Sequence, residues 1–364
     1  MEIAVVFLLW LFICIQLSVI TGFISIRRNR LKPINYTKVA ILVPARNEAQ
    51  NISDCLNALL QLNYPKELLE IWVGDDQSSD DTALIVKGFL EKHPQVHLCQ
   101  IDNNMGSARA KGNVLAQLIA RCKAEYIFVT DADIAVGKNW IIGLLPILQL
   151  PQMGMVSGTT LVKGKGVLEA GQSLDWTLGN GYLIGLNQLG LKSTAVGNNM
   201  AFTRKAYLAT GGYENLPFSV TEDFQLFSAI CSKGFKTENI LDKASLNISK
   251  PQHDFIKLMH QRKRWMMGAQ ALPWYWAVVF GIQAFFYLGV FILAWLNLNL
   301  ALKIWAMKWV LQQSYLLLIH QRLNEKMPWL SFFGYEVYSF FMHLAMIGFY
   351  LSPAKMDWKG RKYP

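Results

Sequence analysis

The pattern of apolar and polar positions changes twice along the chain. Residues 3–24 carry no charged side chain over 22 positions, which is long enough for an α-helix to cross a lipid bilayer. Residues 38–270 instead show short apolar runs separated by polar clusters, as in an α/β domain. Residues 274–296 and 329–351 are again long and mostly apolar. The pattern therefore predicts an α/β domain between an N-terminal membrane anchor and a C-terminal membrane region.

The α/β segment alternates predicted strands with predicted helices. Runs of β-branched and aromatic residues predict buried strands at 39–43, 71–74, 97–101 and 126–129, and helices are expected at about 51–62, after about 82 and at about 108–122. Such alternation predicts a mostly parallel, Rossmann-like sheet with helices on both faces. Because the carboxyl ends of parallel strands meet at one edge, the polar residues after each strand should line one crevice, where such sheets bind ligands.

Aspartates follow two of these strands. Asp75 and Asp76 come after the second strand, and Asp131 and Asp133 come directly after the fourth. Asp is also a common turn and helix-capping residue, so each could serve only to shape a loop. Two carboxylates at a strand end nevertheless suit a divalent cation that takes its other ligands from water and substrate phosphates. The acidic crevice favours a nucleotide with Mg²⁺ or Mn²⁺ over nucleic acid.

Composition and charge favour a membrane protein. Hydrophobic residues make up 52% of the chain and charged residues only 16%, an apolar bias that points to membrane segments. The net charge is +10, and the basic residues Arg27, Arg28, Arg30 and Lys32 directly follow the first apolar segment. The positive-inside rule places them, and the domain after them, in the cytoplasm. The five cysteines show no paired spacing, which fits a reducing compartment without a disulfide framework or zinc site.

Two common nucleotide-binding motifs do not occur. No G-x-G-x-x-G sequence follows the first strand, and no G-x-x-x-x-G-K-[ST] sequence is found anywhere in the chain. Dinucleotide-dependent oxidoreductases and P-loop enzymes therefore lose their main sequence support. A nucleotide in the crevice would instead be held by side-chain carboxylates on its base or ribose and by a metal on its phosphates.

Five motifs, in order, resemble those of family 2 glycosyltransferases. They are VPARNE at 43–48, DDQSSDDT at 75–82, DAD at 131–133, TED at 221–223 and QRKRW at 261–265. Each motif alone is weak, and the specificity comes from their order over residues 38–270. The family includes processive synthases and ceramide-glucosyltransferase-like enzymes. The resemblance implies a GT-A fold and the transfer of a sugar from a nucleotide sugar.

On the donor side, the resemblance implies a nucleotide pocket and a metal. Asp75 or Asp76 would contact the uracil or ribose. Asp133 would bind Mg²⁺ or Mn²⁺ directly, with Asp131 alongside, and the metal would neutralise the leaving diphosphate. Lys111 could add a phosphate contact or could be a solvated helix lysine. The implied nucleotide-sugar residues are Ala45, Glu48, Asp75, Asp76, Lys111 and Asp131, and the implied metal ligands are Asp131 and Asp133.

On the acceptor side, the TED motif would supply the general base. The resemblance implies that Asp223 deprotonates the acceptor hydroxyl, with Glu222 as the alternative. Thr221 could instead only cap a helix, whose dipole the two acids would complement. The segment 195–213 reads as a strand, a short helix and a glycine turn. Within it, the backbone of the candidate acceptor-binding residues would approach a sugar; these are Gly197, Asn198 and Asn199.

The QRKRW motif lies on a predicted helix that could serve two purposes. Gln261, Arg264 and Trp265 share one helix face by their spacing, and the resemblance places them over the active site, with Arg264 near the diphosphate and Trp265 beneath the acceptor. Arg262 and Lys263 point elsewhere and could meet lipid phosphates at the membrane surface.

The number of membrane crossings after residue 273 is open. Residues 298–320 contain Lys303 and Lys308, and a fourth crossing would put the basic tail outside, against the positive-inside rule. Three crossings are therefore expected, with 298–320 interfacial or re-entrant. If 298–320 does cross, Lys308 and Glu336 would lie at similar depth and could pair. The expected regions are an anchor at 1–26, a GT-A domain at 36–250, an interfacial segment at 251–272 and a membrane region with a basic tail at 273–364.

The sequence thus predicts an inverting, metal-dependent glycosyltransferase in a membrane, with its catalytic domain cytoplasmic. The ending WKGRKY at 358–363 resembles the tail of relatives that glycosylate lipids, so a lipid acceptor is expected ahead of a glycan. A processive polysaccharide synthase is the enzymatic alternative, and a catalytically silent nucleotide-binding scaffold is the non-enzymatic one. The short chain suggests a bacterial inner membrane.

Overall fold

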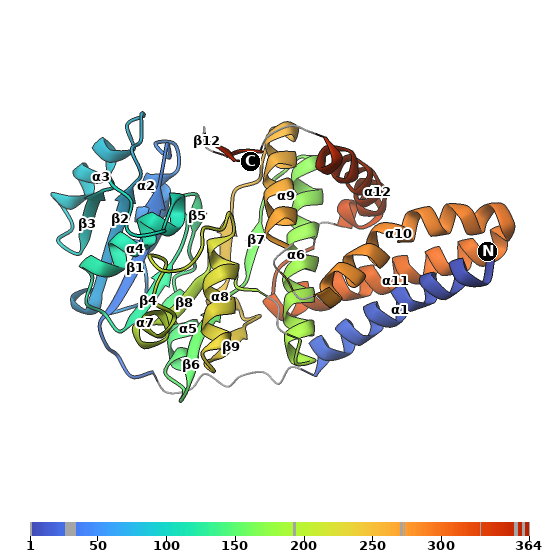
Figure 1. The fold of residues 1–364 in the computed structure, drawn as a ribbon, viewed down its shortest axis with the longest axis horizontal. Helices are drawn as coiled ribbons and strands as arrows, with labels where there is room; N and C mark the ends of the chain where they lie inside the picture. Colours follow the sequence, from blue (N-terminus) through green and yellow to red (C-terminus); the bar gives the residue numbers. More distant parts are fainter. Residues whose placement is uncertain are drawn as a thin grey trace. The chain divides into compact units, whose positions relative to one another are not determined.

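The computed structural model describes residues 2–25, 34–191, 194–269, 272, 274–327, 329–352, 356–358 and 361–363. The chain divides into two compact units (Figure 1). The α/β unit consists of Arg28–Lys163 and Ser193–Lys250, and the helical unit consists of Met1–Arg27, Gly164–Lys192 and Pro251–Pro364. The basic residues Arg27, Arg28, Arg30, Lys32, Lys355 and Lys359 lie outside the described residues.

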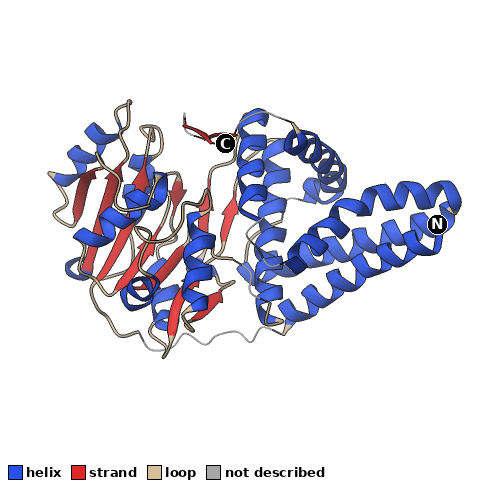
Figure 2. Cartoon of the chain, in the orientation of Figure 1, coloured by secondary structure: helices blue, strands red, loops and turns tan. Residues whose placement is uncertain are grey.

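A seven-stranded sheet with strand order β3-β2-β1-β4-β8-β6-β9 forms the centre of the α/β unit (Figure 2). Strands β1 to β4 are parallel, and β6 and β9 are parallel to each other. Only β8 runs antiparallel to its neighbours β4 and β6, so the prediction of a mostly parallel sheet is confirmed. The strands are β1 (Val39–Ala45), β2 (Leu69–Asp75), β3 (Val96–Gln100), β4 (Tyr126–Val129), β6 (Met153–Ser157), β8 (Met200–Thr203) and β9 (Lys236–Asn239).

Helices cover both faces of this sheet, because the strands are apolar on both sides. In β1, Ile41 and Val43 join one buried cluster, whereas Ala40 and Leu42 join another on the opposite face. The first cluster includes residues of α2 (Ile52–Leu60), α3 (Thr82–Leu90) and α5 (Trp140–Leu148). The second includes residues of α4 (Ala110–Arg121), α7 (Arg204–Thr210) and α8 (Glu222–Ser232).

A smaller sheet extends the unit beside the end of β4. It contains β5 (Ile134–Ala135), β10 (Asn247–Ser249) and β7 (Thr160–Val162). Two short 3₁₀ helices, η1 (Lys66–Leu68) and η2 (Lys243–Ser245), complete the connections.

The helical unit contains the apolar segments. Its elements are α1 (Glu2–Ile24), α6 (Val167–Gln188), α9 (Phe255–Ala269), α10 (Trp274–Leu296), α11 (Leu298–Leu323), α12 (Trp329–Leu351) and the hairpin of β11 (Met356–Trp358) and β12 (Arg361–Tyr363). Within the described part of the chain, α1 and α10 are the two helices long and apolar enough to cross a membrane, by length and composition.

Helix α6 interrupts the domain that the sequence predicts at 36–250, because it packs with the terminal helices. A Cβ atom on Gly185 would lie 2.4 Å from the carbonyl oxygen of Val19, and one on Gly22 would lie 2.5 Å from the carbonyl oxygen of Gly185. Glycines at this crossing let the backbones of α1 and α6 approach more closely than larger residues would. The expected continuous domain is therefore corrected to two segments, with α6 in the helical unit.

The segment 298–320 also differs from expectation. It belongs to one unbroken helix, α11, which packs against α1, α6 and α10, so it is not re-entrant. Lys308 Nζ lies 2.5 Å from Glu336 Oε2 on α12. This is the ion pair that the sequence predicts for the case in which 298–320 crosses the membrane.

Candidate active site

The ends of β1 and β2 form the first part of the candidate site. Asp75 is the last residue of β2, and the backbone N–H of Asp76 donates a 2.9 Å hydrogen bond to the carbonyl of Ala45 at the end of β1. The carboxylate of Asp75 accepts a 3.3 Å hydrogen bond from the backbone N–H of Ser78. Asp75 and Asp76 are only 5% and 8% exposed. These predicted nucleotide contacts therefore lie where neighbouring strands end, and the loop after them fixes Asp75.

Glu48 lies in the loop after β1 and is 4% exposed. Its backbone N–H donates to the Thr82 hydroxyl at 2.8 Å, and its carboxylate accepts from the Asn51 amide at 2.8 Å. Asp80 accepts hydrogen bonds from the backbone N–H groups of Ala49 and Thr82, each at 3.0 Å. Burial alone would raise the pKa of Asp80, but these hydrogen bonds lower it. Asp80 thus joins the loops after β1 and β2.

Lys111 connects the DAD and TED motifs. Its Nζ lies 2.7 Å from Asp131 Oδ1 and 2.9 Å from Glu222 Oε1. Burial alone would lower the pKa of Lys111, but the charges of Asp131, Glu222 and Asp223 raise it, so the ammonium stays protonated. The sequence predicts Lys111 as a phosphate contact. The structure gives it a second role, as the cation that holds two acidic motifs together.

The buried thiol of Cys55 lies close to three carboxylates of the site, those of Asp133, Asp131 and Glu48. Burial raises its pKa, and Asp133, Asp131 and Glu48 raise it further. The thiol also contacts the carbonyl oxygen of Asp131, at 3.6 Å. The end of β4 and the loop after β1 are therefore parts of one acidic site. The sequence gives no motif that would single out Cys55.

Asp223, the predicted general base, is held by backbone N–H groups. Gly197 donates to its Oδ2 at 3.0 Å, and Phe224 donates to its Oδ1 at 2.8 Å. A Cβ atom on Gly197 would lie 2.5 Å from Asp223 Oδ2 and 2.8 Å from Asp223 Cβ. Glycine is therefore required at 197 so that the carboxylate can approach the backbone. The structure explains this glycine by Asp223, whereas the sequence predicts an approach to the acceptor sugar.

The antiparallel strand β8 brings 197–199 to the carboxyl end of β4. Met200 at the start of β8 pairs with Val129 at the end of β4, and the Thr130 hydroxyl donates to the carbonyl of Asn198 at 3.1 Å. The Asn198 side chain accepts from the Thr160 hydroxyl at 2.9 Å. The segment therefore borders the same site as Asp131.

Asn199 has a structural role that the sequence does not predict. Its side chain is fully buried, accepts from Trp140 Nε1 at 2.7 Å and donates to the carbonyls of Thr159 and Ser245 at 2.8 and 2.9 Å. With its oxygen and both hydrogens engaged, the amide ties α5 and the loop before β10 to β8. Its backbone N–H and carbonyl also bind Val196 and Gly158, at 2.8 and 2.9 Å, so the expected acceptor contact rests on the other two residues of this segment.

The QRKRW motif lies on α9 in the helical unit. The ring of Trp265 meets that of Trp176 on α6 edge to face, with centroids 5.3 Å apart. Arg262 lies over the Trp265 ring at 4.7 Å and forms a 3.0 Å ion pair with Asp175. Lys263 Nζ donates to the carbonyl of Ser352 at 3.0 Å. The expectation that Arg262 and Lys263 face lipid is therefore wrong, because a carboxylate and a helix end within the unit bind them.

Comparison with known proteins identifies the family. Glycosyl transferase family 21 matches residues 6–364. The chain belongs to this family. Family 21 is part of the same superfamily as the family 2 enzymes whose motifs the sequence resembles, and it has the GT-A fold.

Relatives of this family 21 protein include lipid glycosyltransferases. β-Monoglucosyldiacylglycerol synthase of Synechocystis sp. is 25% identical over 248 residues, which cover 65% of this chain and 48% of that protein. The probable glycosyltransferase YdaM of Bacillus subtilis is 28% identical over 237 residues, which cover 64% of this chain and 55% of that protein. The chain thus spans about half the length of the curated relatives it matches.

A solved structure supports the fold. The mannosyltransferase PcManGT from Pyrobaculum calidifontis, in complex with GDP-Man and Mn²⁺, matches with a TM-score of 0.59 at 18% identity. The match covers 89% of this chain and 98% of that one. The family 21 chain therefore has the GT-A fold expected from its motifs.

The donor set of the acidic site fits a hard divalent cation. Asp131 and Asp133 supply carboxylate oxygens. Among the described residues no group of three or more His, Cys, Asp or Glu side chains is placed to hold an ion. Carboxylate oxygens suit hard cations such as Mg²⁺ or Mn²⁺, which take further ligands from water and phosphate. Asp131 is already paired with the ammonium group of Lys111.

Proposed function

We propose that this family 21 protein transfers a sugar, with inversion, from a nucleotide sugar to the hydroxyl group of a membrane lipid. The observation that carries the proposal is the bridge through Lys111, at 2.7 Å from Asp131 and 2.9 Å from Glu222. This bridge brings the predicted donor-side motif and the motif of the predicted base to one site. A transfer reaction needs both at the same sugar.

The donor would lie along the carboxyl ends of β1, β2 and β4. The buried carboxylates of Asp75 and Asp76 would accept hydrogen bonds from the base or ribose, and Ala45 and Glu48 would border the pocket. UDP-sugars are the first donors to test, because the motifs resemble those of enzymes that bind uracil. When bound, Mg²⁺ or Mn²⁺ on Asp133 and Asp131 would neutralise charge on the leaving diphosphate.

Asp223 would act as the base in a single displacement. The acceptor oxygen attacks the anomeric carbon, its proton passes to the Asp223 carboxylate, and the bond from the anomeric carbon to the diphosphate oxygen breaks. The N–H groups of Gly197 and Phe224 orient that carboxylate. Lys111 already binds the Glu222 carboxylate at 2.9 Å, so Asp223 rather than Glu222 is proposed as the base.

The acceptor assignment draws on the named relatives and the apolar helices. Two of the long helices could cross a membrane, and one relative is named for making a glucosyldiacylglycerol. Trp265 would form the floor of the acceptor site, with Gln261 and Arg264 on the same face of α9. Gly197 and Asn198 would border the acceptor from the sheet.

The proposed location follows from this assignment. The anchor at 1–26 and the region at 273–364 would hold the protein in a bacterial inner membrane, with the interfacial segment 251–272 at its surface. The catalytic domain within 36–250 would face the cytoplasm, where nucleotide sugars are made.

The test is release of nucleoside diphosphate by the purified full-length protein across UDP- and GDP-sugars. It is run with Mn²⁺, with and without lipid extract, beside Asp223→Asn, which removes the base but keeps the shape of the side chain. Release that rises with lipid and is lost in the variant supports the proposal. Release that ignores lipid and yields long sugar chains would instead identify a polysaccharide synthase. Nucleotide binding without release would identify a non-catalytic scaffold.

A further inference from the structure

Helix α11 runs beside α1 along nearly all of its length. At one end, the rings of Phe23 and Tyr315 have centroids 5.1 Å apart, and Arg322 donates to the carbonyl of Phe23 at 3.1 Å. Toward the other end, Leu9 and Ala301 belong to one buried cluster with residues of α10. The two helices are therefore parallel. At 26 residues α11 is about 39 Å long, so it crosses any layer that α1 crosses.

Three polar residues in the middle and second half of α11 are buried, whereas several of its apolar residues, together with Lys303 near its start, are exposed. Lys308, Gln313 and His320 are at most 5% exposed, whereas Leu302 and Val310 are 54% and 53% exposed. This arrangement explains why α11 is less apolar than α1 by composition but still presents an apolar outer surface. Charged residues inside a membrane are tolerated when they are turned inward and paired.

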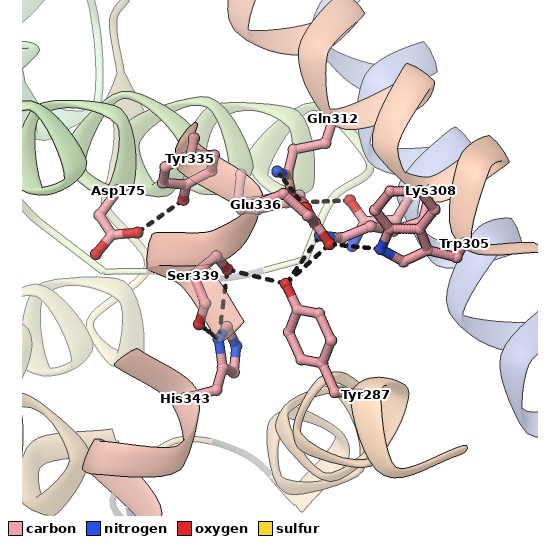
Figure 3. Close-up of polar contacts among 11 residues, drawn as sticks. Asp175, Tyr287, Trp305, Lys308, Gln312, Tyr335, Glu336, Ser339 and His343 are labelled. Carbon is pink, nitrogen blue, oxygen red and sulfur yellow. Dashed lines mark hydrogen bonds and ion pairs between the residues drawn. The ribbon is translucent and has the colours of Figure 1, made fainter. Parts of the chain in front are cut away.

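The partner of Lys308 is Glu336, close to the start of α12 (Figure 3). The carboxylate of Glu336 also accepts from Tyr287 at 3.2 Å and from Trp305 Nε1 at 3.1 Å. The start of α12 therefore reaches the middle of α11. The partners of the Glu336 carboxylate thus come from α10 and α11. A charged side chain within the hydrocarbon layer needs such partners from the protein.

Beyond Glu336, α12 still contacts Tyr287 of α10 through Phe340 and His343, and it also runs along α6. Tyr335 and Tyr338 donate to Asp175 on α6 at 2.7 and 3.1 Å, and a Cβ atom on Gly171, one turn earlier in α6, would lie 2.3 Å from the Tyr338 ring. The two helices therefore run antiparallel. Helix α6 itself meets α1 near its C-terminal end, through the contact of Gly185 with Val19.

The C-terminal end of α12 lies against α9. The rings of Phe349 and His260 have centroids 5.1 Å apart, and Lys263 donates to the carbonyl of Ser352. Helix α9 is followed in the chain by α10. Helix α12 follows α11, and the last turn of α11 lies beside Phe23 at the end of α1. Both ends of α12 are thus connected to the same end of the bundle, the end at which α1 leads into the α/β unit.

One face of α12 is apolar and exposed. Val337, Phe341, Leu344 and Leu351 are 59%, 61%, 53% and 76% exposed, at a spacing that places them on one stripe of the helix. The neighbouring α10 also exposes apolar side chains, including Phe291 at 61%. The stripe therefore continues an apolar surface that belongs to a predicted membrane span.

We infer that α12 is inserted into one leaflet of the membrane from the catalytic side and does not cross it. The chain crosses three times, by α1, α10 and α11, and the apolar stripe of α12 contacts the acyl chains of that leaflet. The sequence predicts that 329–351 crosses and that 298–320 is interfacial or re-entrant. In this inference α11 crosses and α12 does not. The basic tail returns to the catalytic side, as the positive-inside rule requires. The inference rests on the proposed membrane location and not on the transfer chemistry.

The first test maps which side each connection faces. Single cysteines are placed at Trp295 (Trp295→Cys, beside the α10–α11 turn), at Lys326 (Lys326→Cys, between α11 and α12) and after Pro364 in the full-length protein. Intact and permeabilised cells are treated with a membrane-impermeant maleimide, and the unmodified protein gives the background from its own cysteines. The cysteine at 295 should be labelled in intact cells, and the other two only after permeabilisation.

Two outcomes would overturn the inference. Labelling of the C-terminal cysteine in intact cells would mean that α12 crosses the membrane. Protection of the cysteine at 295 in intact cells would mean that the α10–α11 hairpin does not cross. Asp223→Asn should give the same labelling pattern as the wild type, because topology does not depend on catalysis. A failure of sugar transfer is thereby distinguished from a failure of the topology.

A second test measures the depth of the stripe directly. A nitroxide label is placed by Leu344→Cys on α12 or by Val310→Cys in the middle of α11, in protein reconstituted into phosphatidylglycerol and phosphatidylethanolamine vesicles. Both labels should collide more with oxygen than with a water-soluble nickel chelate, and the label at 344 should be the shallower one. A label at 344 that prefers the nickel chelate would show that the stripe faces water and would refute the lipid contact.

Discussion

Gly197→Ala tests whether the geometry of Asp223 controls catalysis. The added Cβ would lie 2.5 Å from Asp223 Oδ2 and 2.8 Å from Asp223 Cβ, far inside ordinary van der Waals contact. Because Gly197 also donates a hydrogen bond to that oxygen, the carboxylate must move or the loop must retreat. Either change displaces the proposed base by roughly 0.5–1 Å, the scale at which misplaced reacting groups lose about 100-fold in rate.

A 100-fold loss in kcat corresponds to about 2.7 kcal/mol of barrier. The same crowding should lower the free energy of unfolding by about 1–3 kcal/mol, the usual cost of overpacking. Donor binding should change little, because the proposed nucleotide contacts at β1 and β2 lie in other loops. The expected signature is therefore a fall in kcat at nearly constant KM for the nucleotide sugar.

The assay is initial-rate release of nucleoside diphosphate with lipid acceptor, at varied donor concentration. Gly88→Ala is the matched control, since a Cβ at Gly88 in α3 would meet nothing within 4 Å. It should leave kcat unchanged and stabilise the helix by about 0.5–1 kcal/mol. If Gly197→Ala keeps kcat within about threefold of wild type, a change smaller than a tenth of the loss expected from displacement, Asp223 is not held in place as the structure implies. Asp223→Asn then decides whether it is the base at all.

Three further perturbations address the other parts of the protein. Lys111→Met leaves Asp131 and Glu222 without their shared cation and should cost about 2 kcal/mol of stability, less than the 3–5 kcal/mol of a fully buried pair. These carboxylates raise the pKa of Lys111. Its contribution to the free energy of unfolding should therefore be complete below the unfolded-state pKa near about 10.4 and be lost only as pH rises through the folded pKa. A melting-temperature difference between wild type and variant that varies between about pH 6 and 9 would contradict this. Arg262→Lys keeps the charge but loses the planar guanidinium that pairs with Asp175 through one nitrogen and lies over Trp265, the proposed floor of the acceptor site. It should raise KM for the lipid acceptor several-fold and leave KM for the donor unchanged, and equal changes in both would argue against a role at the acceptor. Chelation with EDTA should abolish transfer and added Mn²⁺ or Mg²⁺ should restore it, whereas full activity in EDTA would exclude the proposed metal.

Local sequence was enough to predict the strands and where their polar ends lie. The run at 39–43 falls within β1 and that at 126–129 coincides with β4, because a strand buried on both faces must be apolar throughout. Since parallel strands share one carboxyl edge, their order in the chain already implied that Asp75 and Asp131 meet at one rim. The segment 195–213 was likewise predicted correctly as a strand, a short helix and a glycine turn, which are β8, α7 and Gly211 with φ of 85°.

Contacts between distant segments needed the tertiary structure. By sequence Lys111 could be a phosphate contact or a solvated helix lysine, and only the packing of α4 on β1 and β2 brings it between two carboxylates. Arg262 reads as a lipid anchor, yet Asp175, 87 positions earlier, binds it. The sequence offers the Lys308–Glu336 pair only as one of two cases, and the packing of α11 with α12 decides that the pair forms. A sequence determines which residues are apolar and what chemistry each side chain carries. Whether a charged side chain faces lipid, water or another charge depends on its partner, and that partner is fixed only when the helices pack.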